Sequence, residues 1–142
     1  GMGLRARYAG VVLDLAWALF ELRVHAAPEA DPDLIWTSLT SRYLRIAPYP
    51  EWSWWAMRGQ LVDAPGYLIN YALGAFITAD LRARVRELRG ASAWYDPDTY
   101  GWLSDRLYRF GLERTSRRVL EDFLGRPLRP DAMLHDLGRL TR

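Results

Sequence analysis

Two tyrosines and an asparagine near the middle of the chain are the residues best suited to bind a ligand. Tyr67, Asn70, Tyr71, Gly74 and Thr78 stand at offsets of 0, 3, 4, 7 and 11, a spacing that puts them on one face of a helix. The two phenols and the amide of such a stripe could donate hydrogen bonds to a carbonyl, an oxyanion or a terminal carboxylate in a cleft. Tyrosines on a core helix more often pack with one satisfied hydroxyl, so the spacing alone favours a packing role.

No other set of residues in the sequence assembles a familiar active site. The chain has no Cys, and because all 19 basic residues are Arg, thiol nucleophiles, thiolate zinc sites and Schiff-base lysines are excluded. His25 and His135 belong to no HExxH pair, and the nucleophile-elbow, phosphate-loop and dinucleotide motifs are missing. Glu21 and Asp80 are isolated carboxylates, and we expect Glu21 to pair with an arginine. The sequence therefore predicts no catalytic residue, no metal ligand and no cofactor in this chain.

The polar stripe must be carried by a helix, which the sequence predicts over residues 64–89. Residues 64–79 carry no formal charge, and little of their helical circumference is polar, as is typical of a helix surrounded by other protein. Asp63 can cap this helix, Pro65 suits its first turn, and Gly90 follows its last turn as a C-cap. We expect the helix to be central and largely buried.

Helical periodicity continues on both sides of this segment, and no stretch alternates with period two. The predicted fold is all-α, with about six helices packed around the central helix in a single domain over residues 1–142. Helix starts at Asp31-Pro32 and at Thr115 or Ser116, a stop at Gly125 and similar signals place the other helices at residues 4–25, 33–46, 98–110, 116–124 and 132–140. We expect a short aromatic helical turn at residues 51–57 that folds over the core.

Charge and hydropathy argue against two classes of partner. The net charge of +2 is small for a nucleic-acid-binding protein. The uncharged run is too short to predict a membrane span, and it is interrupted by Pro65, Gly66 and Asn70. No signal-peptide pattern is visible at the N-terminus. We therefore expect a cytoplasmic protein that binds neither nucleic acid nor membranes.

Residues 66–81 read GYLINYALGAFITADL, which is similar to the pattern G-Y-x-x-x-Y-x-L-G-x-x-x-A-x-x-L. This pattern resembles one found late in zinc carboxypeptidases of the carboxypeptidase Taq type and in related gluzincin oligopeptidases. Other segments, in the same order along the chain, resemble the elements that flank the pattern in that family. They are Glu21, Asp33-Leu34 with Trp36, Tyr43, Leu44 and Ile46, and then Trp102-Leu103, residues 107–111, residues 124–128 and Leu134.

The resemblance implies a helical protein that contacts peptides. In this family two His of an HExxH motif and a downstream Glu hold zinc, and the Glu of the motif activates water. By resemblance, Tyr67 and Tyr71 lie at one wall of the substrate cleft, where they contact the peptide or stabilise the tetrahedral oxyanion. Gly66 and Asn70 are included with them as substrate-binding residues. Zinc is thus a cofactor of the full-length family, and none of its ligands is expected in this chain.

The sequence also departs from the family pattern. Gln60-Leu61 stands where the carboxypeptidases have His-Trp, and Tyr108 and Phe110 stand where the family has two His. A carboxypeptidase relative and an oligopeptidase relative are therefore equally compatible with the sequence.

Two hypotheses for function follow. In the first, the chain is the C-terminal, substrate-cleft part of a zinc metallopeptidase, inactive by itself, whose partners are a peptide substrate or the missing N-terminal part of the peptidase. In the second, it is a stand-alone helical module that binds a peptide or another protein without catalysis. Since a wall of a larger cleft would expose apolar surface, a homo-oligomer is also expected.

Overall fold

The computed structural model describes residue 3 and residues 8–140, and these form seven α-helices and no strand. The prediction of an all-α fold is confirmed. The helices are α2 (Val11–Ala26), α3 (Pro32–Leu39), α4 (Gln60–Asp63), α5 (Ile69–Arg89), α6 (Thr99–Leu103), α7 (Ser116–Leu124) and α8 (Asp131–Gly138). The chain divides into two compact units, residues 1–75 and 76–142, with the boundary inside α5.

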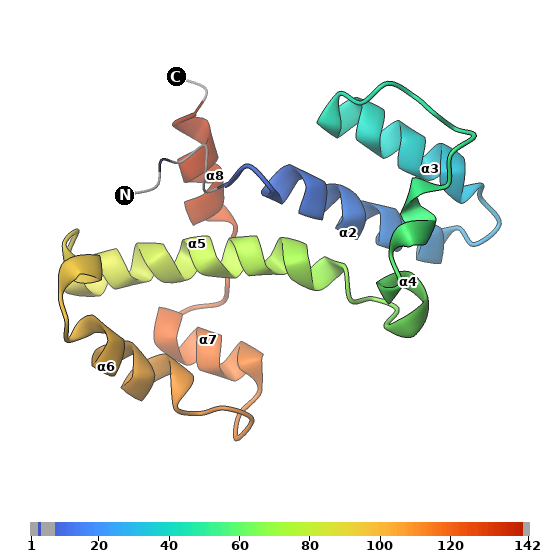
Figure 1. Ribbon diagram of the computed structural model, residues 1–142. Coiled ribbons are helices and arrows are strands. Elements are labelled where there is room, and N and C mark those ends of the chain that lie inside the picture. The colour runs from blue at the N-terminus through green and yellow to red at the C-terminus, as the bar shows by residue number, and fades with distance from the viewer. Residues whose placement is uncertain (1–2, 4–7, 141–142) are drawn as a thin grey trace. The chain divides into compact units, whose positions relative to one another are not determined.

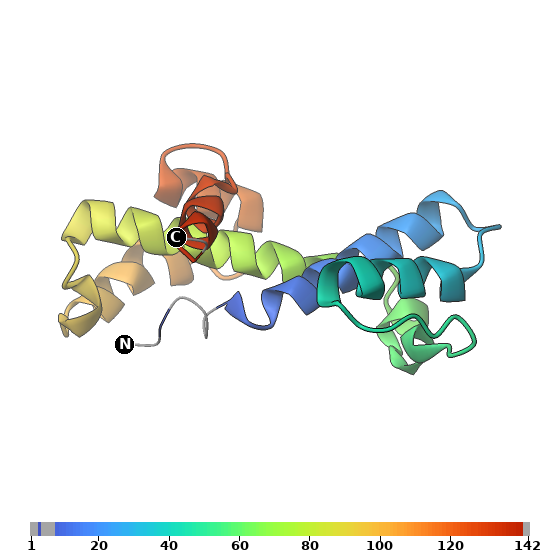
Figure 2. The same cartoon turned by 90° about the horizontal axis from the view of Figure 1, so that it is seen from above.

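In the first unit, α2 and α3 pack side by side (Figures 1 and 2). The start of α3 follows the sequence signal, because the Asp31 carboxylate accepts a hydrogen bond from the Asp33 N–H at 2.9 Å and Pro32 occupies the first turn. The two helices enclose an aromatic core, in which the rings of Trp17 and Trp36 stack with their centroids 3.9 Å apart. The buried members of this core are Trp17, Phe20, Trp36, Leu39 and Leu68.

The rest of the first unit is built from short turns. A π-helical turn, Thr40–Leu44, continues α3 and ends at Arg45, whose φ of 59° lies in the left-handed region. A 3₁₀ turn, Trp54–Met57, confirms the predicted aromatic helical turn, and α4 follows it. The predicted helix over residues 4–25 corresponds to α2, although residues 4–7 lie outside the part of the chain that the structure describes.

The predicted start of the central helix is wrong. α5 begins at Ile69 rather than at residue 64, because α4 ends at Asp63 and residues 64–68 form turns. The reason is a positive φ of 86° at Gly66, which no right-handed helix accommodates. Fewer positions of α5 are buried than the sequence predicts. The buried positions are Ala72, Ala79, Asp80 and Val85.

In the second unit, the remainder of α5 and helices α6, α7 and α8 follow in order, with a π-helical turn, Ser104–Tyr108, directly after α6. The predicted caps are confirmed: the Thr115 side chain accepts from the Arg118 N–H at the start of α7, and Gly125, with a φ of 71°, ends it. Gly90, with a φ of 84°, follows α5 in the same way. The buried core of the unit consists of Val85, Ala93, Leu103, Leu107, Val119, Phe123 and Leu124.

A buried ion pair ties α5 to the segment after α7. Asp80 is fully buried, and its two oxygens accept from the Arg126 guanidinium at 2.5 and 2.8 Å. The Arg129 N–H donates to the same carboxylate at 3.1 Å. These hydrogen bonds, led by the one from the Arg126 side chain, lower the pKa of Asp80 below its ordinary value of 3.8, in spite of the burial that opposes the charge.

Candidate functional site

The turn that precedes α5 is held in place by Glu21, a residue of α2. The Glu21 carboxylate is fully buried, and it accepts hydrogen bonds from the N–H groups of Gly66 at 2.7 Å and Leu68 at 2.9 Å. Leu68 is inserted into the aromatic core of the first unit. The turn is therefore anchored at its backbone by a carboxylate and at one side chain by apolar packing.

The expectation that Glu21 pairs with an arginine is not met among the described residues. Among the described residues, no arginine nitrogen lies within ion-pair distance of it, and backbone N–H groups are its partners instead. The physical reason is that residues 64–68 are not helical, so their N–H groups are available as donors to a buried charge. Spacing along the chain could not show this, because Glu21 and Gly66 are 45 positions apart.

The anchored turn carries the predicted tyrosines at the surface. Tyr67 lies just before α5 and Tyr71 lies in its first turn, and their rings meet edge to face with centroids 5.6 Å apart. The residues are 45% and 44% exposed, and no described residue forms a hydrogen bond with either hydroxyl. Asn70 is also exposed, and its side-chain amide has no hydrogen-bond partner among the described residues. The structure thus brings the two tyrosines together and leaves Asn70 exposed in the same turn of the chain, and the polar groups of all three are available to a ligand.

The first unit also contains a cavity that sequence reasoning missed. Its volume is about 480 Å³, and it lies between the aromatic face of α2 and α3 and the segment that leads from α3 to α4. Most of the surrounding side chains are apolar. The lining residues are Leu13, Trp17, Trp36, Thr37, Thr40, Leu44, Ile46, Ala47, Tyr49, Trp52, Trp54, Met57 and Arg58.

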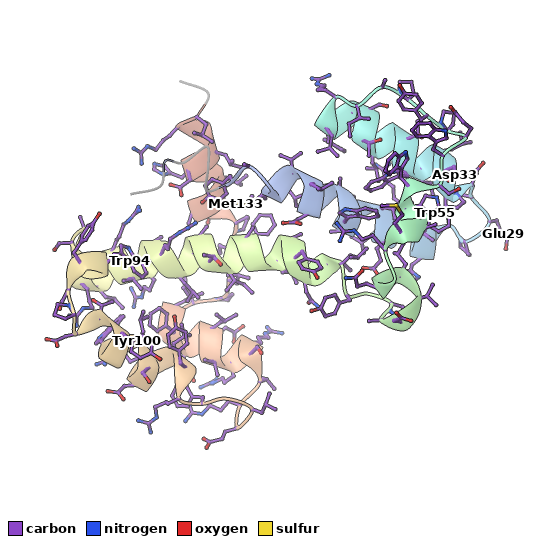
Figure 3. The ribbon with its side chains drawn as sticks, in the orientation of Figure 1. Glu29, Asp33, Trp55, Trp94, Tyr100 and Met133 are labelled. Atoms are coloured by element: carbon purple, nitrogen blue, oxygen red, sulfur yellow. The ribbon has the colours of Figure 1, made fainter. Side chains whose placement is uncertain are left out.

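The shape of the cavity wall is fixed by Asp33, at the start of α3. Its carboxylate accepts from the Trp55 indole N–H at 2.6 Å and from the Ser53 hydroxyl at 3.1 Å (Figure 3). The Trp55 ring in turn lies 5.8 Å from the ring of Phe20 in the core. The hydrogen bonds of Ser53 and Trp55 therefore hold this loop on both sides of Trp54. Neither Ser53 nor Trp55 lines the cavity.

Arg58 is the one charged residue in the described lining of the cavity. Its guanidinium lies over the Trp17 ring at 4.8 Å, and no described carboxylate is within ion-pair distance of it. Trp17 offers the cavity no donor, because its buried indole N–H has no accessible surface and no acceptor among the described residues. The Arg58 guanidinium is thus the charged group with which a ligand in this cavity could pair.

The sequence did contain a signal for this cavity. The aromatic cluster at residues 51–57 is evident, but we interpreted it as a cover over the core. In the structure only Trp55 of this segment packs against the core cluster, whereas Trp52, Trp54 and Met57 are exposed and line the cavity. Which tryptophans face inward depends on the hydrogen bond to Asp33, and no periodicity reveals it.

The second unit contains a smaller hollow of about 300 Å³. It is lined by side chains of both charges, with Arg82 and Arg86 on α5 facing Asp131 and Asp136 on α8. His135 also lines it, while His25 lies at the end of α2 in the first unit. Within residues 3 and 8–140, no three His, Asp or Glu side chains gather as metal ligands would. No helix in that part of the chain is long and apolar enough to cross a membrane.

Comparisons with models of protein families, with curated proteins and with solved structures find no match to this chain. Function must therefore be argued from the two features of the first unit, the tyrosine-bearing turn and the aromatic cavity.

Proposed function

We propose that this chain is the C-terminal, substrate-cleft part of a zinc-dependent metallopeptidase and that it binds peptide through Tyr67 and Tyr71. The sequence resemblance to carboxypeptidases of the Taq type and to gluzincin oligopeptidases motivates this proposal. In it, the chain contributes a wall that orients the peptide, and it is not catalytically competent by itself.

One observation carries the proposal. The resemblance singled out Glu21 and the segment from Gly66 as separate elements, and in the structure the Glu21 carboxylate holds the Gly66 and Leu68 N–H groups. Burying a carboxylate is costly unless it is well hydrogen-bonded, so a fully buried Glu that serves one turn indicates that the turn must keep its shape. Tyr67 stands between the two anchored N–H groups, so its position depends directly on Glu21.

The chemistry available at the turn suits a peptide. Two half-exposed phenols with unoccupied hydroxyls can donate hydrogen bonds to peptide carbonyls, and in a complete site they could stabilise the oxyanion that forms when water attacks the scissile carbonyl. The exposed Asn70 amide can both donate to and accept from a peptide backbone. These groups bind and orient, but none of them activates water.

Zinc would be held outside these residues. The sequence contains no HExxH, so in this proposal the two His ligands and the water-activating Glu belong to a segment that precedes these residues in the same gene. The coding sequence around these residues tests the point, since the proposal expects HExxH in frame upstream. A stand-alone helical binding module, the second hypothesis, expects no such sequence.

The binding half of the proposal is tested with a panel of unstructured peptides, followed by NMR of the ¹⁵N-labelled chain. Peptides should shift the amide signals of residues 66–71, and Tyr67→Phe or Tyr71→Phe should weaken binding about 2–10-fold each, because each substitution removes one hydrogen bond and keeps the ring. Tyr95→Phe is the matched control, since Tyr95 is 82% exposed and lies in the other unit. Equal affinities for all three variants would refute a role for the phenols.

The catalytic half is tested with the same peptides and added zinc. We expect no hydrolysis by the purified chain, with or without the metal. Zinc-dependent turnover that survives repurification would overturn the claim that the chain is inactive alone.

A further inference from the structure

We infer that the aromatic cavity of the first unit is a binding site for a small hydrophobic carboxylate. The apolar body of the ligand lies among the tryptophans, and its carboxylate pairs with Arg58. This inference concerns the cavity between α2, α3 and residues 44–58, and it does not depend on the peptidase relationship.

The size and the lining of the cavity suit a small apolar body. Ligand sites in proteins typically enclose about 300–1,000 Å³ and are lined by hydrophobic and aromatic side chains with a few polar groups. This cavity, at about 480 Å³, lies within that range. Trp52 and Trp54 are about half exposed, so a ligand that covers them gains hydrophobic free energy without displacing any packed side chain.

The charge of the ligand follows from Arg58. A guanidinium carries its charge at every physiological pH, and stacking on an indole leaves the N–H groups at its edge free to bind a carboxylate in the bidentate manner. Arg58 has no acidic partner among the described residues, and it borders an apolar cavity where a counter-ion from the ligand would be weakly screened. The structure therefore assigns an anion to the part of the cavity that Arg58 borders.

Arg58 also argues against a cationic ligand, which a cluster of tryptophans would otherwise suggest. Aromatic cages bind quaternary ammonium groups through the negative faces of their rings. Here the face of Trp17 is already occupied by the Arg58 guanidinium, and a second cation beside it would be repelled. A cationic ligand is thus disfavoured at this site by the charge that favours an anionic one.

The site is also formed before the ligand arrives. Asp33 holds Ser53 and Trp55 on either side of Trp54, so the wall keeps its shape without help from the ligand (Figure 3). A preformed site loses little conformational entropy on binding, which favours measurable affinity for a small molecule.

The experiment is isothermal titration of the wild-type chain with three isosteric probes, 4-phenylbutyrate, 4-phenylbutanol and 4-phenylbutylamine. The carboxylate should bind at least about tenfold more tightly than the alcohol, since hydrogen bonds to a charged group are stronger than neutral ones, and the amine should bind most weakly. Equal affinity for the carboxylate and the alcohol, or tighter binding of the amine, would overturn the inference. So would the absence of binding by the carboxylate at millimolar concentration.

A variant localises the effect. Arg58→Gln should reduce carboxylate affinity about tenfold or more and leave alcohol affinity within about twofold, with circular dichroism confirming the fold. Arg45→Gln is the matched control, because Arg45 is an exposed arginine at the end of the preceding π-helical turn and does not line the cavity. Unchanged carboxylate affinity in Arg58→Gln would contradict the assignment of the anion to Arg58. The wild-type probe series remains decisive even if that variant does not fold.

Two further probes distinguish the source of the carboxylate. Decanoate represents a free fatty acid, and an acetylated dipeptide ending in Phe represents a peptide C-terminus. If either probe competes with 4-phenylbutyrate, the result supports a site for hydrophobic carboxylates. The probe that competes then identifies the carboxylate as that of a fatty acid or of a peptide C-terminus. Failure of both to compete would contradict a site for hydrophobic carboxylates in general.

Discussion

At the scale of single residues, two buried carboxylates have different structural roles. Glu21 accepts from backbone N–H groups and so determines where a turn lies, whereas Asp80 accepts mainly from Arg126 and so joins two segments of the second unit. Both are fully buried, and in each case the negative charge is compensated by donors that the chain supplies. Replacing either one should therefore be costly.

Glu21→Gln should destabilise the chain by about 2 kcal/mol or more. The amide carbonyl can accept from one of the two N–H groups, but the amide NH₂ then faces the other donor, and the charge that strengthened both hydrogen bonds is lost. Urea unfolding monitored by circular dichroism measures the change. Glu29→Gln, at an exposed position in the loop between α2 and α3, is the control and should stay within about 0.5 kcal/mol of wild type.

The contribution of Asp80 should depend on pH with a definite sign. Because its pKa is lowered in the folded state, the unfolded chain binds the proton more readily, and the ionised group stabilises the fold at pH values above its ordinary pKa of 3.8. This stability is lost as the pH falls through the folded pKa. The difference in unfolding free energy between wild type and Asp80→Asn should therefore be constant from about pH 8 to pH 5 and shrink below about pH 4. A difference that grows on acidification would show that the ion pair does not lower the pKa.

At the scale of elements, the central feature is the turn at residues 64–68, which ends one helical segment and starts α5. Gly66 sits there with a φ of 86°, a conformation that costs other residues about 1–2 kcal/mol. The turn exposes Tyr67 and buries Leu68, so two adjacent residues face the surface and the core respectively. The tyrosine pair is thus positioned by backbone conformation as much as by helical periodicity.

A matched pair of glycine substitutions tests this account of the turn. A Cβ at either Gly66 or Gly74 would meet no other atom within 4 Å, so the two sites differ in backbone conformation and not in available space. Gly66→Ala should destabilise the chain by about 1 kcal/mol or more, while Gly74→Ala, inside α5, should stabilise it by about 0.5–1 kcal/mol. Thermal unfolding of both variants is the measurement. Changes of the same sign would show that the turn does not require a left-handed residue.

Some helix boundaries could be predicted from the sequence, whereas the start of α5 could not. Helix starts and ends marked by local chemistry, such as Asp31-Pro32, Thr115 and Gly125, lie where the sequence placed them, because a cap is a contact between near neighbours. The start of α5 differs from the one that Asp63 and Pro65 predict, because Gly66 takes a positive φ and donates its N–H to Glu21, far away in the chain.

The same distinction between local and distant contacts applies to the candidate site. Tyr67, Asn70 and Tyr71 could be grouped from their spacing, and in the structure the rings of Tyr67 and Tyr71 are in contact while Asn70 is exposed. The cavity could not be predicted, because its walls come from three separate segments and its loop is shaped by the hydrogen bonds of Asp33. Sequence periodicity reports which face of an element is apolar, but not which apolar side chains stay uncovered.

At the scale of the whole molecule, several large apolar side chains are exposed to water. Met57 is 76% exposed and Val62 82% exposed in the first unit, and Leu112 in the second is fully exposed. Such side chains are expected on a chain that contributes one wall of a larger assembly. They support the proposal that it associates with another polypeptide segment or with itself.

Self-association should therefore be measurable. Light scattering coupled to size-exclusion chromatography should give a mass above 16.4 kDa for the purified chain, rising with concentration towards a dimer or a larger species. Val62→Asp, which adds a charge to an exposed apolar position of α4, should lower that mass if the surface near the turn takes part. A constant monomer mass at high concentration would count against association through exposed apolar surface.

The central claim is that the Glu21-anchored turn presents Tyr67 and Tyr71 to a peptide, and NMR titration of the labelled wild-type chain tests it most directly. The account predicts saturable shifts of the residue 66–71 amides on addition of peptide, weakened in Tyr67→Phe and Tyr71→Phe and unaffected in Tyr95→Phe. If peptide binding leaves the amides of residues 66–71 unchanged, or if no peptide of the panel binds at millimolar concentration, the claim is contradicted.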